Sequence, residues 1–325
     1  MNQALTPAKL LELTQLNTSF STTLPGLQLA LDSTSMGALK ECPRKYFYTV
    51  ICGWQPRQQS VHLTFGLHYH AALEAYDHAK SRGFTHKQAL HVAVKMALVL
   101  TWDKNLKRPW FSDDPYKNRL TLVRSVLWYL DSFEHDPMVT VQLSNGKPAV
   151  ELSFRFETPH VSPEGLPFMW CGHLDRVGEM NGQIWILDRK TSKNPIDERY
   201  FKQFSPSNQM SGYTFAGKVA YKQPVQGIII DACQILVSGT RFKRGVVMRD
   251  DAQLNEWMDD IGIYVNHAVS YAKECYWPMN DKSCGNFGGC PFQMICGKSP
   301  LVREQWLESA FYKRVWDPLQ VRGDI

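Results

Sequence analysis

Several kinds of segment are missing from this chain of 325 residues. No apolar run is long enough to cross a bilayer, and the chain does not open with a basic stretch followed by an apolar one, so we expect a soluble, cytoplasmic protein. The sequence has no internal repeat and no low-complexity tract, which excludes a repeat architecture. It also lacks a G-x4-G-K-[ST] motif, so the chain carries no nucleotide-driven motor of its own.

Neither sign of charge dominates the composition. The 36 Lys and Arg stand against 31 Asp and Glu, and the net charge of +5 is compatible with a polyanionic partner without establishing one. A hydrophobic content of 44% with 21% charged residues is ordinary for a globular protein. Because 325 residues exceed a typical single core, we expect one large domain with appendages or two close-packed lobes.

Cysteine is present, but without the close C-x2-C pairs of zinc ribbons. In a reducing compartment the eight cysteines point away from disulfides and towards a metal or redox role. Five residues separate Cys284 from Cys290, and five separate Cys290 from Cys296. Three thiolates are one short of a tetrahedral set, and Cys42 is the best candidate for the fourth ligand. An iron–sulfur cluster ranks first, because it is held by four thiolates, then a zinc site, and last uncoordinated thiols.

The chain is organised around a hairpin over residues 169–192. Its turn is Asn181-Gly182, a strong two-residue hairpin signal because a type I′ turn needs positive φ at both positions. Counting outward sets Asp175 opposite Asp188, and Lys190 returns to the same face. Two carboxylates and an ammonium so placed can hold a divalent cation beside a water and a phosphate. A solvated hairpin face with an Asp–Lys ion pair is the alternative.

Sequence periodicity predicts an α/β fold. Helices are expected over residues 7–16, 33–50, 64–80, 86–102 and 115–133, from Ser205-Pro206 onward, and over 252–272. Strands are expected from Ala149, in the hairpin, and over residues 227–237. A strand, a helix and a strand in this order suggest a crossover that returns to the same sheet.

Two of the predicted helices have faces that can be assigned. The helix over residues 64–80 places Leu67, His70, Ala71 and Glu74 on one face. A lone histidine there is usually a core residue, but a His and a Glu one turn apart can both reach a metal. The expected buried stripe of the helix over residues 115–133 is formed by Leu120, Val123, Leu127 and Leu130.

Residues 104–114 combine Lys and Arg with Trp110 and Phe111. Such a mixture can contact a nucleic acid. A solvated loop between two helices is the favoured interpretation.

Four motifs in order carry a family resemblance. They are a G-x3-H motif ending at His70, Gly172-His-Leu-Asp175, Asp188-Arg-Lys190, and a Q-x3-Y motif from Gln209 to Tyr213. This order resembles the PD-(D/E)XK nucleases of the RecB-like branch. One cysteine before the core and three after it resemble the iron–sulfur subgroup, which includes AddB-type helicase–nuclease subunits, CRISPR-associated RecB-like nucleases and phage exonucleases. The five-residue spacing of the late cysteines departs from that subgroup, which more often has two residues between the first pair.

The resemblance implies a role for each matched residue. The expected ligands of Mg²⁺ or Mn²⁺ are His70, Asp175, Asp188 and the carbonyl of Arg189. Lys190 would orient or activate the attacking water, and Gln209 and Tyr213 would position the phosphate backbone or the lysine. The expected ligands of an iron–sulfur cluster, of the 4Fe–4S type, are Cys42, Cys284, Cys290 and Cys296.

The implied fold is a PD-(D/E)XK nuclease core, a mixed sheet flanked by helices, with a helical N-terminal region and a C-terminal iron–sulfur clasp. The expected divisions are an N-terminal segment over residues 1–32, the nuclease domain over 33–275 with a helical insertion at about 80–140, and the clasp and tail over 276–325.

The implied activity is metal-dependent DNA cleavage, by an exonuclease acting on DNA ends or single strands in recombination, repair or phage replication. The expected partners are DNA and a helicase or a recombination or annealing protein, in the cytoplasm of a prokaryotic or phage-infected cell. A structure-specific endonuclease, a non-cleaving DNA-binding subunit with a structural cluster, and a zinc-stabilised partner-binding module are the alternatives.

Overall fold

The computed structural model describes residues 19–58, 60–220 and 224–320, and the chain divides into two compact units. The first, called the terminal unit, comprises Met1–Gln58, Arg155–Gly172 and Asp250–Ile325. The second, called the central unit, comprises Gln59–Phe154 and His173–Arg249. The helix predicted over residues 7–16 lies outside the described residues. None of the described helices combines the length and the apolar character that a membrane span requires.

A mixed sheet runs through the chain, and its described part has seven strands. The strand bounds are β1 Ala30–Leu31, β5 Val139–Thr140, β6 Val150–Val161, β7 Pro167–Met180, β8 Gln183–Ser192, β9 Val225–Ile235 and β10 Thr240–Val247. The main order is β1-β7-β8-β9-β10, and β5 and β6 also pair with β7. β8 and β9 are parallel, as the predicted crossover requires, whereas β7–β8 and β9–β10 are antiparallel.

The hairpin between β7 and β8 has the predicted register. Asn181 and Gly182 have φ values of 54° and 73°, the positive pair that a type I′ turn needs. Met180 pairs with Gln183, and the ladder continues to Arg176 opposite Leu187. The next step outward sets Asp175 opposite Asp188, so the turn alone places the two carboxylates.

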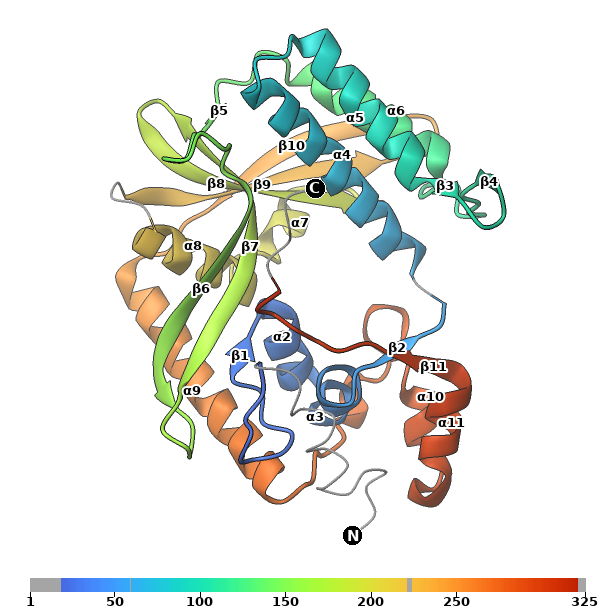
Figure 1. Ribbon diagram of the computed structural model, residues 1–325, viewed down its shortest axis with the longest axis vertical. Coiled ribbons are helices and arrows are strands. Elements are labelled where there is room, and N and C mark those ends of the chain that lie inside the picture. Colours follow the sequence, from blue (N-terminus) through green and yellow to red (C-terminus); the bar gives the residue numbers. More distant parts are fainter. Residues whose placement is uncertain (1–18, 59, 221–223, 321–325) are drawn as a thin grey trace. The chain divides into compact units, whose positions relative to one another are not determined.

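Helices cover both faces of the sheet in the central unit (Figure 1). Their bounds are α4 Val61–Ser81, α5 His86–Leu100, α6 Arg119–Ser132, α7 Glu198–Lys202 and α8 Asn208–Ala220. α4, α5 and α6 form a core with Cys233 and Ile235 of β9, whereas α8 packs on a second core that includes Ile228 and Ile230. Alternate residues of β9 therefore face opposite helical layers, as expected of a strand buried on both sides. The two short strands β3 Trp102–Asp103 and β4 Arg108–Pro109 lie between α5 and α6 in the sequence.

The buried stripe predicted for α6 is correct only in part: Leu130 is buried and Val123 packs against the core, whereas Leu120 lies outside it. Leu120 is 81% exposed, and the buried apolar residues are Leu122, Val126, Tyr129 and Leu130. Thr121 and Ser125 share that buried face, and their hydroxyls donate to the backbone carbonyls of Tyr116 and Thr121. Small hydroxyls bonded to backbone are tolerated in a core, so polarity alone did not mark the face.

The terminal unit contains several short elements and one long helix. They are α2 Ser33–Glu41, α3 Pro43–Tyr46, the π-helix η1 Phe47–Ile51, β2 Trp54–Pro56, α9 Asp251–Lys273, η2 Asp281–Ser283, η3 Asn286–Gly288, α10 Gln293–Cys296, η4 Pro300–Val302, α11 Arg303–Ala310 and β11 Phe311–Lys313. β11 pairs with β2, and β1 is parallel to β7 at Met169 and Trp170.

The helix predicted over residues 33–50 is interrupted at Cys42. This residue has extended angles, φ −161° and ψ 112°, because a residue before proline is pushed out of the helical region and Pro43 starts a new turn. The N-cap of α2 is Asp32, and its side chain accepts the N–H of Ser35. The break leaves the Cys42 thiol at a junction between two helices.

Candidate active site

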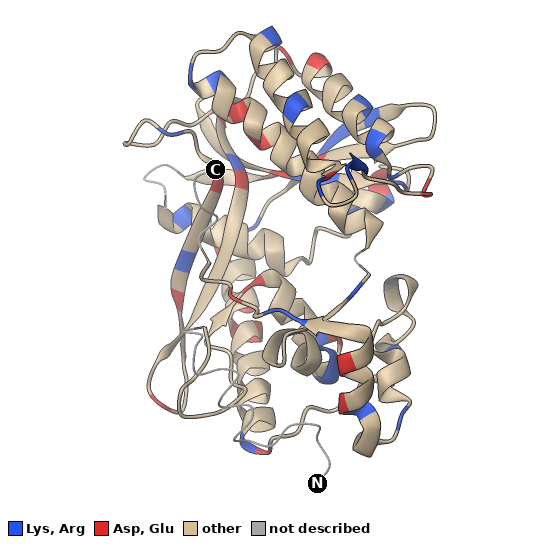
Figure 2. Cartoon of the chain, turned by 45° about the vertical axis from the view of Figure 1, so that its right-hand side comes forward, with Lys and Arg blue, Asp and Glu red and all other residues tan. Residues whose placement is uncertain are grey.

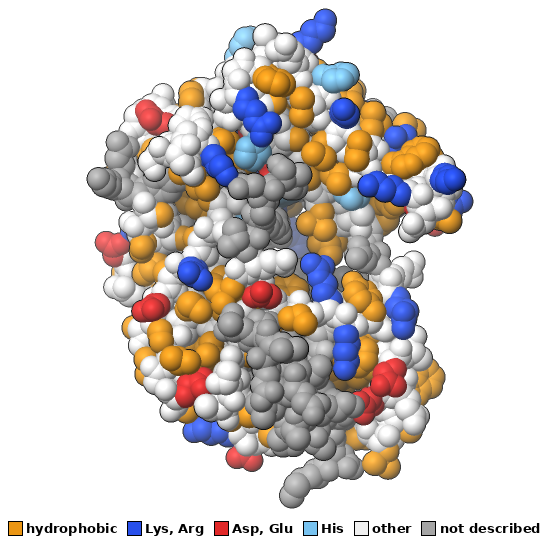
Figure 3. Space-filling model, in the orientation of Figure 1, with side chains coloured by type: hydrophobic (Ala, Val, Ile, Leu, Met, Phe, Trp, Pro, Cys, Tyr) orange, Lys and Arg blue, Asp and Glu red, His pale blue; other side chains and the backbone are white. Residues whose placement is uncertain are grey.

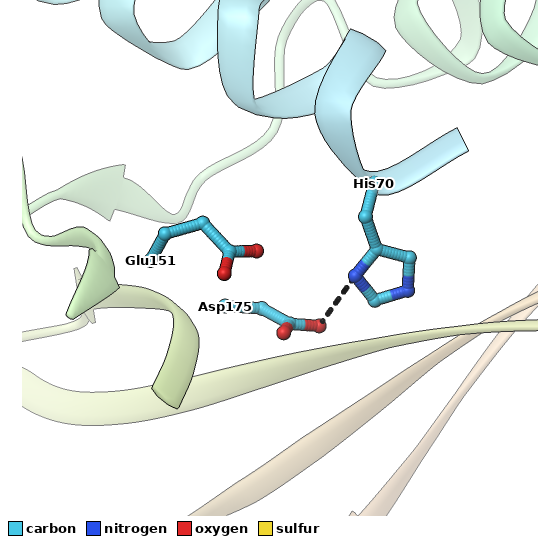
Figure 4. A group of neighbouring side chains, drawn as sticks. All are labelled: His70, Glu151 and Asp175. Atoms are coloured by element: carbon cyan, nitrogen blue, oxygen red, sulfur yellow. Dashed lines mark ion pairs between the residues drawn. The ribbon is translucent and has the colours of Figure 1, made fainter. Parts of the chain in front are cut away.

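Three potential metal ligands meet in the central unit: His70, Glu151 and Asp175 (Figure 4). His70 comes from α4, Glu151 from β6 and Asp175 from β7. One donor atom from each lies within 4.8 Å of the others, and His70 Nδ1 is 3.3 Å from Asp175 Oδ2. The same Asp175 oxygen accepts the backbone N–H of Arg189 at 2.8 Å. Helix α4, strand β6 and the β7–β8 hairpin thus come together at the Asp175 carboxylate.

Glu151 was missed by the sequence reasoning, which treated it as one polar residue of an alternating strand. It adopts φ of 48° near the start of β6, a left-handed conformation that is uncommon for a residue other than glycine. β6 pairs with β7, which carries Asp175. An acidic residue on the strand next to the hairpin was the available signal, but periodicity does not reveal a local departure from the pleat.

Asp188 and Lys190 form the second part of the site. Lys190 Nζ donates to Asp188 Oδ1 at 2.9 Å and to Gln209 Oε1 at 3.0 Å. The amide nitrogen of Gln209 donates in turn to the Tyr213 hydroxyl at 2.8 Å. Gln209 and Tyr213 lie four apart on α8, as predicted, so one helix face orients the lysine.

The two aspartates have opposite electrostatic environments. Burial by itself would raise the pKa of Asp175, but His70, Lys190 and the N–H of Arg189 outweigh it, so the pKa is lowered. Burial raises the pKa of Asp188 to about 6, against the effect of Lys190 and with the help of the Asp175 charge. For His70 and Lys190, the nearby carboxylates overcome burial and raise the pKa of each.

The Arg189 side chain points away from Asp188 and Lys190, as the alternation of a strand requires. Its guanidinium donates to Asp77 at 2.6 Å, and the two side chains are only 3% and 6% exposed. Arg189 and Asp77 thus form a buried ion pair rather than a surface one. Asp77 lies seven residues after His70 on α4. The pair therefore connects the helix that carries His70 to the strand that carries Asp188.

Glu74, which the helical spacing placed beside His70, does not join this group. It lies 3.7 Å from His78 Nε2, one turn further along α4. Leu67, assigned to the same face, is 49% exposed, whereas the buried residues of α4 include Phe65, Tyr69 and Leu73. His70 therefore lies at the edge of the buried face of α4 rather than at its centre.

The donor set fits a divalent cation. Carboxylate oxygens suit Mg²⁺ and Mn²⁺, and an imidazole nitrogen suits transition metals. Asp188 is 1% exposed, and within the described residues its Oδ2 accepts no hydrogen bond, although Lys190 Nζ lies 2.9 Å away. A buried carboxylate oxygen with an unfilled acceptor position, beside a second carboxylate, is an environment that a cation would stabilise.

The four predicted cluster cysteines all lie in the terminal unit and are free thiols. Burial and the neighbouring thiols Cys42 and Cys284 raise the pKa of Cys290, and burial together with Cys290 and Cys42 raises that of Cys296. Four thiolates would therefore repel one another without a cation. In the described chain their sulfur atoms do not form a compact group like that of His70, Glu151 and Asp175.

Polar and basic groups surround these thiols. The backbone N–H of Asn280 donates to Cys42 Sγ at 3.3 Å, and Cys290 N–H donates to the carbonyl of Cys284 at 2.8 Å. Arg44 and Arg303 lower the pKa of Cys296, although less than burial raises it. The N–H donor to Cys42 and the two arginines near Cys296 are compatible with a metal centre bound by cysteine thiolates.

Comparisons with known proteins were made for the whole chain. The profile of the PD-(D/E)XK nuclease superfamily matches residues 33–297. A candidate exonuclease from Eubacterium rectale has a similar solved structure, with 11% identity, a TM-score of 0.47, and coverage of 79% of this chain and 86% of that chain. The structure of SSO0001 gives 10% identity, a TM-score of 0.35, and coverage of 83% and 87%. No curated protein sequence matches significantly.

Proposed function

Because this chain belongs to the PD-(D/E)XK nuclease superfamily, we propose that it is a metal-dependent DNA exonuclease of the RecB-like branch. The superfamily implies a hydrolytic nuclease. The observation that carries the finer proposal is the assembly of Asp175, Asp188 and Lys190 with His70 at one site. These residues come from three of the four motifs by which the sequence resembles that branch, and the fourth motif supplies Gln209, which contacts Lys190.

Mg²⁺ or Mn²⁺ would be held by His70, Asp175, Asp188 and the Arg189 carbonyl, with Glu151 as an added ligand. When bound, such an ion lowers the pKa of a water and offsets charge on the phosphate. The protein supplies the geometry: the Arg189 N–H holds Asp175, and the Asp77–Arg189 pair fixes α4 against β8. Holding the reacting groups in position in this way can lower a large part of the activation free energy of phosphoryl transfer.

Lys190 would orient the attacking water and hold positive charge beside the phosphate. Its ammonium stays protonated, because Asp188 and Asp175 raise its pKa against burial. Gln209 holds it on one side, and the Tyr213 phenol that supports Gln209 stays neutral, since burial and the two aspartates raise its pKa. The chain Lys190–Gln209–Tyr213 thus fixes a charge rather than transferring a proton along α8.

We place the substrate among DNA ends and single strands, in recombination, repair or phage replication, with a helicase or an annealing protein as the expected partner. The net charge of +5 is compatible with a polyanion. A structure-specific endonuclease is the second candidate within the same chemistry. A non-cleaving subunit is disfavoured, because a site without chemistry would gain nothing from a buried carboxylate whose pKa is raised.

End-labelled linear DNA and closed circular DNA, single- and double-stranded, would test the activity with Mg²⁺, Mn²⁺ or EDTA. We expect linear DNA to be degraded only with metal, and circles to survive. Cleaved circles would indicate an endonuclease. Binding without cleavage under all metal conditions would indicate a non-cleaving subunit.

For the cysteine group we propose an iron–sulfur cluster of the 4Fe–4S type, held by Cys42, Cys284, Cys290 and Cys296 as a clasp near the two ends of the sequence. The N–H donated to Cys42 Sγ supports a bound cationic centre, and Cys42 and Cys284 add to the rise that burial causes in the pKa of Cys290. Iron and acid-labile sulfide analysis, with the visible absorbance of the purified protein, would separate this cluster from zinc. Zinc without iron would contradict the proposal.

A further inference from the structure

A two-stranded hairpin extends the central unit between α5 and α6. β3 and β4 with their flanking residues, 101–111, are called the arm; in Figure 1 it lies at the end of α5 where α6 begins. Its base is closed by a hydrogen bond from the Trp110 N–H to the Thr101 carbonyl at 2.8 Å. Thr101 is fully buried, and its hydroxyl donates to the Ala97 carbonyl at 2.6 Å. The arm therefore has a fixed root on α5.

The tip of the arm is also ordered by specific bonds. Asp103 and Arg108 are opposite residues of the β3–β4 ladder. The Asp103 Oδ1 atom accepts the N–H groups of Asn105 and Leu106, both at 2.9 Å. Lys107 closes the loop with φ of 50°. A side chain that satisfies the backbone of a turn in this way holds the turn in one conformation.

The arm exposes large apolar side chains. Trp102 is 45% exposed, Leu106 59% and Phe111 78%. Trp110, in contrast, lies edge-on to His68 of α4, with ring centroids 6.0 Å apart. One aromatic side chain thus anchors the arm and two others face solvent, although a small ordered hairpin gains nothing in stability from exposed aromatic rings.

Cations lie beside these rings. Lys104, Lys107 and Arg108 are all exposed, and Asp103, the acid within the arm, is engaged by the loop backbone. Within the described residues, none of the three cations forms an ion pair. Figure 2 shows basic residues on this hairpin, and Figure 3 shows basic and hydrophobic side chains side by side on the same projection of the central unit.

We propose that the arm binds single-stranded DNA, with bases stacked on Trp102 and Phe111 and phosphates beside Lys104, Lys107 and Arg108. This inference rests on the proposed function and names the form of DNA that the chain recognises. Stacking on aromatic side chains combined with cations that follow the backbone is how proteins bind single strands without reading their sequence.

Two alternatives fit the arm less well. A duplex keeps its base faces stacked inside, so exposed Trp and Phe rings would have nothing to stack on. The core of a protein–protein interface is depleted in Lys, whereas here the cations are interspersed with the aromatic rings. The arm also belongs to the same unit as His70, since Trp110 contacts α4 two residues from that histidine. A strand bound here would be held by the body that carries the site.

Fluorescence anisotropy with a labelled oligo-dT would test the proposal on the full chain in EDTA, where cleavage is stopped. We expect Trp102→Ala/Phe111→Ala to weaken binding at least about tenfold, the effect of losing two stacked bases. Replacing Lys104, Lys107 and Arg108 by alanine should reduce the slope of log K against log salt by about 2, at roughly 0.7 for each lost phosphate contact. Quenching of a 2-aminopurine in the strand should disappear with the aromatic variant alone.

Each variant has a matched control in the same unit. Trp128→Ala removes an aromatic side chain with the same exposed fraction, 45%, from α6. Arg82, Lys87 and Lys95, changed to alanine together, remove one Arg and two Lys that are likewise exposed. Because the two arm rings lie at the surface, the melting temperature should be unchanged.

Three results would overturn the proposal: single-strand affinity unaffected by the aromatic variant, equal losses in the controls, or duplex DNA bound as tightly and with the same dependence on the rings. The first would assign the arm to a protein partner. Arm-dependent binding by a chain that cleaves no DNA with any metal would instead refute the exonuclease and leave the arm assignment standing.

Discussion

The carboxylate site and the proposed cysteine cluster differ in how far apart along the chain their residues lie. Asp175 and Asp188 meet because a two-residue turn fixes the register of one hairpin. Cys42 and the three late cysteines come from opposite ends of the sequence and lie in the same unit, but within the described residues their sulfur atoms form no compact group. The first arrangement is local and rigid. The second depends on long-range closure.

The two groups also differ in how their charges are satisfied before a cofactor binds. Asp175 already has His70 and the Arg189 N–H, and Asp188 has Lys190. The thiols have weaker support, and burial together with their neighbours raises the pKa of Cys290 and Cys296. We therefore expect loss of an ion at the carboxylates to lower the rate of cleavage, and loss of a cluster at the cysteines to lower the stability of the fold.

Substitution of the aspartates is expected to have the largest effect on cleavage. Asp175→Ala or Asp188→Asn should lower cleavage by about 10³-fold or more, because each carboxylate serves an ion that is worth several kcal/mol in the transition state. DNA binding should survive, as measured by anisotropy in EDTA. Full cleavage by both variants would show that Asp175 and Asp188 are not ligands of a catalytic metal ion.

The same variants should differ in apo stability. The pKa of Asp188 is raised on folding, so its ionised form destabilises the native state above about pH 6, and Asp188→Asn should keep or raise the melting temperature. The pKa of Asp175 is lowered, so its charge stabilises the native state at neutral pH, and Asp175→Ala should lower the melting temperature.

Lys190→Ala should lose about 10²–10³-fold in turnover, the usual effect of removing a positioned charge at the reaction centre. Mn²⁺ affinity should change little, since an ammonium is not a ligand for a cation. Lys190→Arg should not restore activity, because a planar guanidinium does not replace a compact charge held by Gln209. Loss of Mn²⁺ binding together with activity, by isothermal titration, would contradict this role.

The sequence was most informative where structure is local. The turn at Asn181-Gly182 determined the register, and with it the positions of Asp175, Asp188 and Lys190. The Q-x3-Y spacing was likewise confirmed by the contact of Gln209 with Tyr213 on α8. These features follow from the period of one element and do not depend on the rest of the fold.

Features that depend on several elements were missed. Glu151 joins His70 and Asp175 only because β6 pairs with β7 and its backbone turns to φ of 48°. The burial of the Arg189 ion pair depends on α4 supplying Asp77. The buried face of α6 was assigned correctly at Leu130 and Val123 but not at Leu120, because its leucines fit two helical stripes and contacts with other elements decide between them.

Cys42→Ser tests the other side of the comparison. In the idealised cross-link model, a clasp that closes most of the chain into a loop contributes on the order of 4–5 kcal/mol. We expect lost iron, a lower melting temperature and protease-sensitive ends, with cleavage falling only in proportion to the folded fraction. Cys52→Ser is the control, since Cys52 is also buried, at 3% exposed against 6% for Cys42. If both variants keep iron equally, or only Cys52→Ser loses it, Cys42 is not the fourth ligand.

The Asp77–Arg189 pair shows how far the carboxylate site relies on its support. Asp77→Asn leaves a buried guanidinium without its carboxylate and should cost about 3–5 kcal/mol, or roughly 10 °C in melting temperature. Asp136→Asn is the control: Arg244 is 21% exposed and keeps Asp231 at 3.3 Å, so its loss should be smaller. The double variant Asp77→Leu/Arg189→Leu should recover most of the stability, because removing both charges removes the penalty. Equal losses in Asp77→Asn and Asp136→Asn would show that the first pair has no special role.

The smallest expected effect is the pH dependence of metal binding, which concerns the carboxylates and not the thiols. A cation binds the ionised form of Asp188, and burial raises the pKa of that carboxyl to about 6, so below this pH the ion must displace a proton. Asp188 alone should then make Mn²⁺ affinity about tenfold weaker at pH 5 than at pH 8, whereas an aspartate with an ordinary pKa near 4 would change it little.

Isothermal titration in buffers of different ionisation heat would measure the protons released on binding, and Asp188→Asn should release fewer. His70 contributes in the same direction, because the pKa of His70 is also raised and only neutral imidazole can be a ligand. Affinity that stays flat from pH 8 to pH 5 would mean that the ion does not contact Asp188.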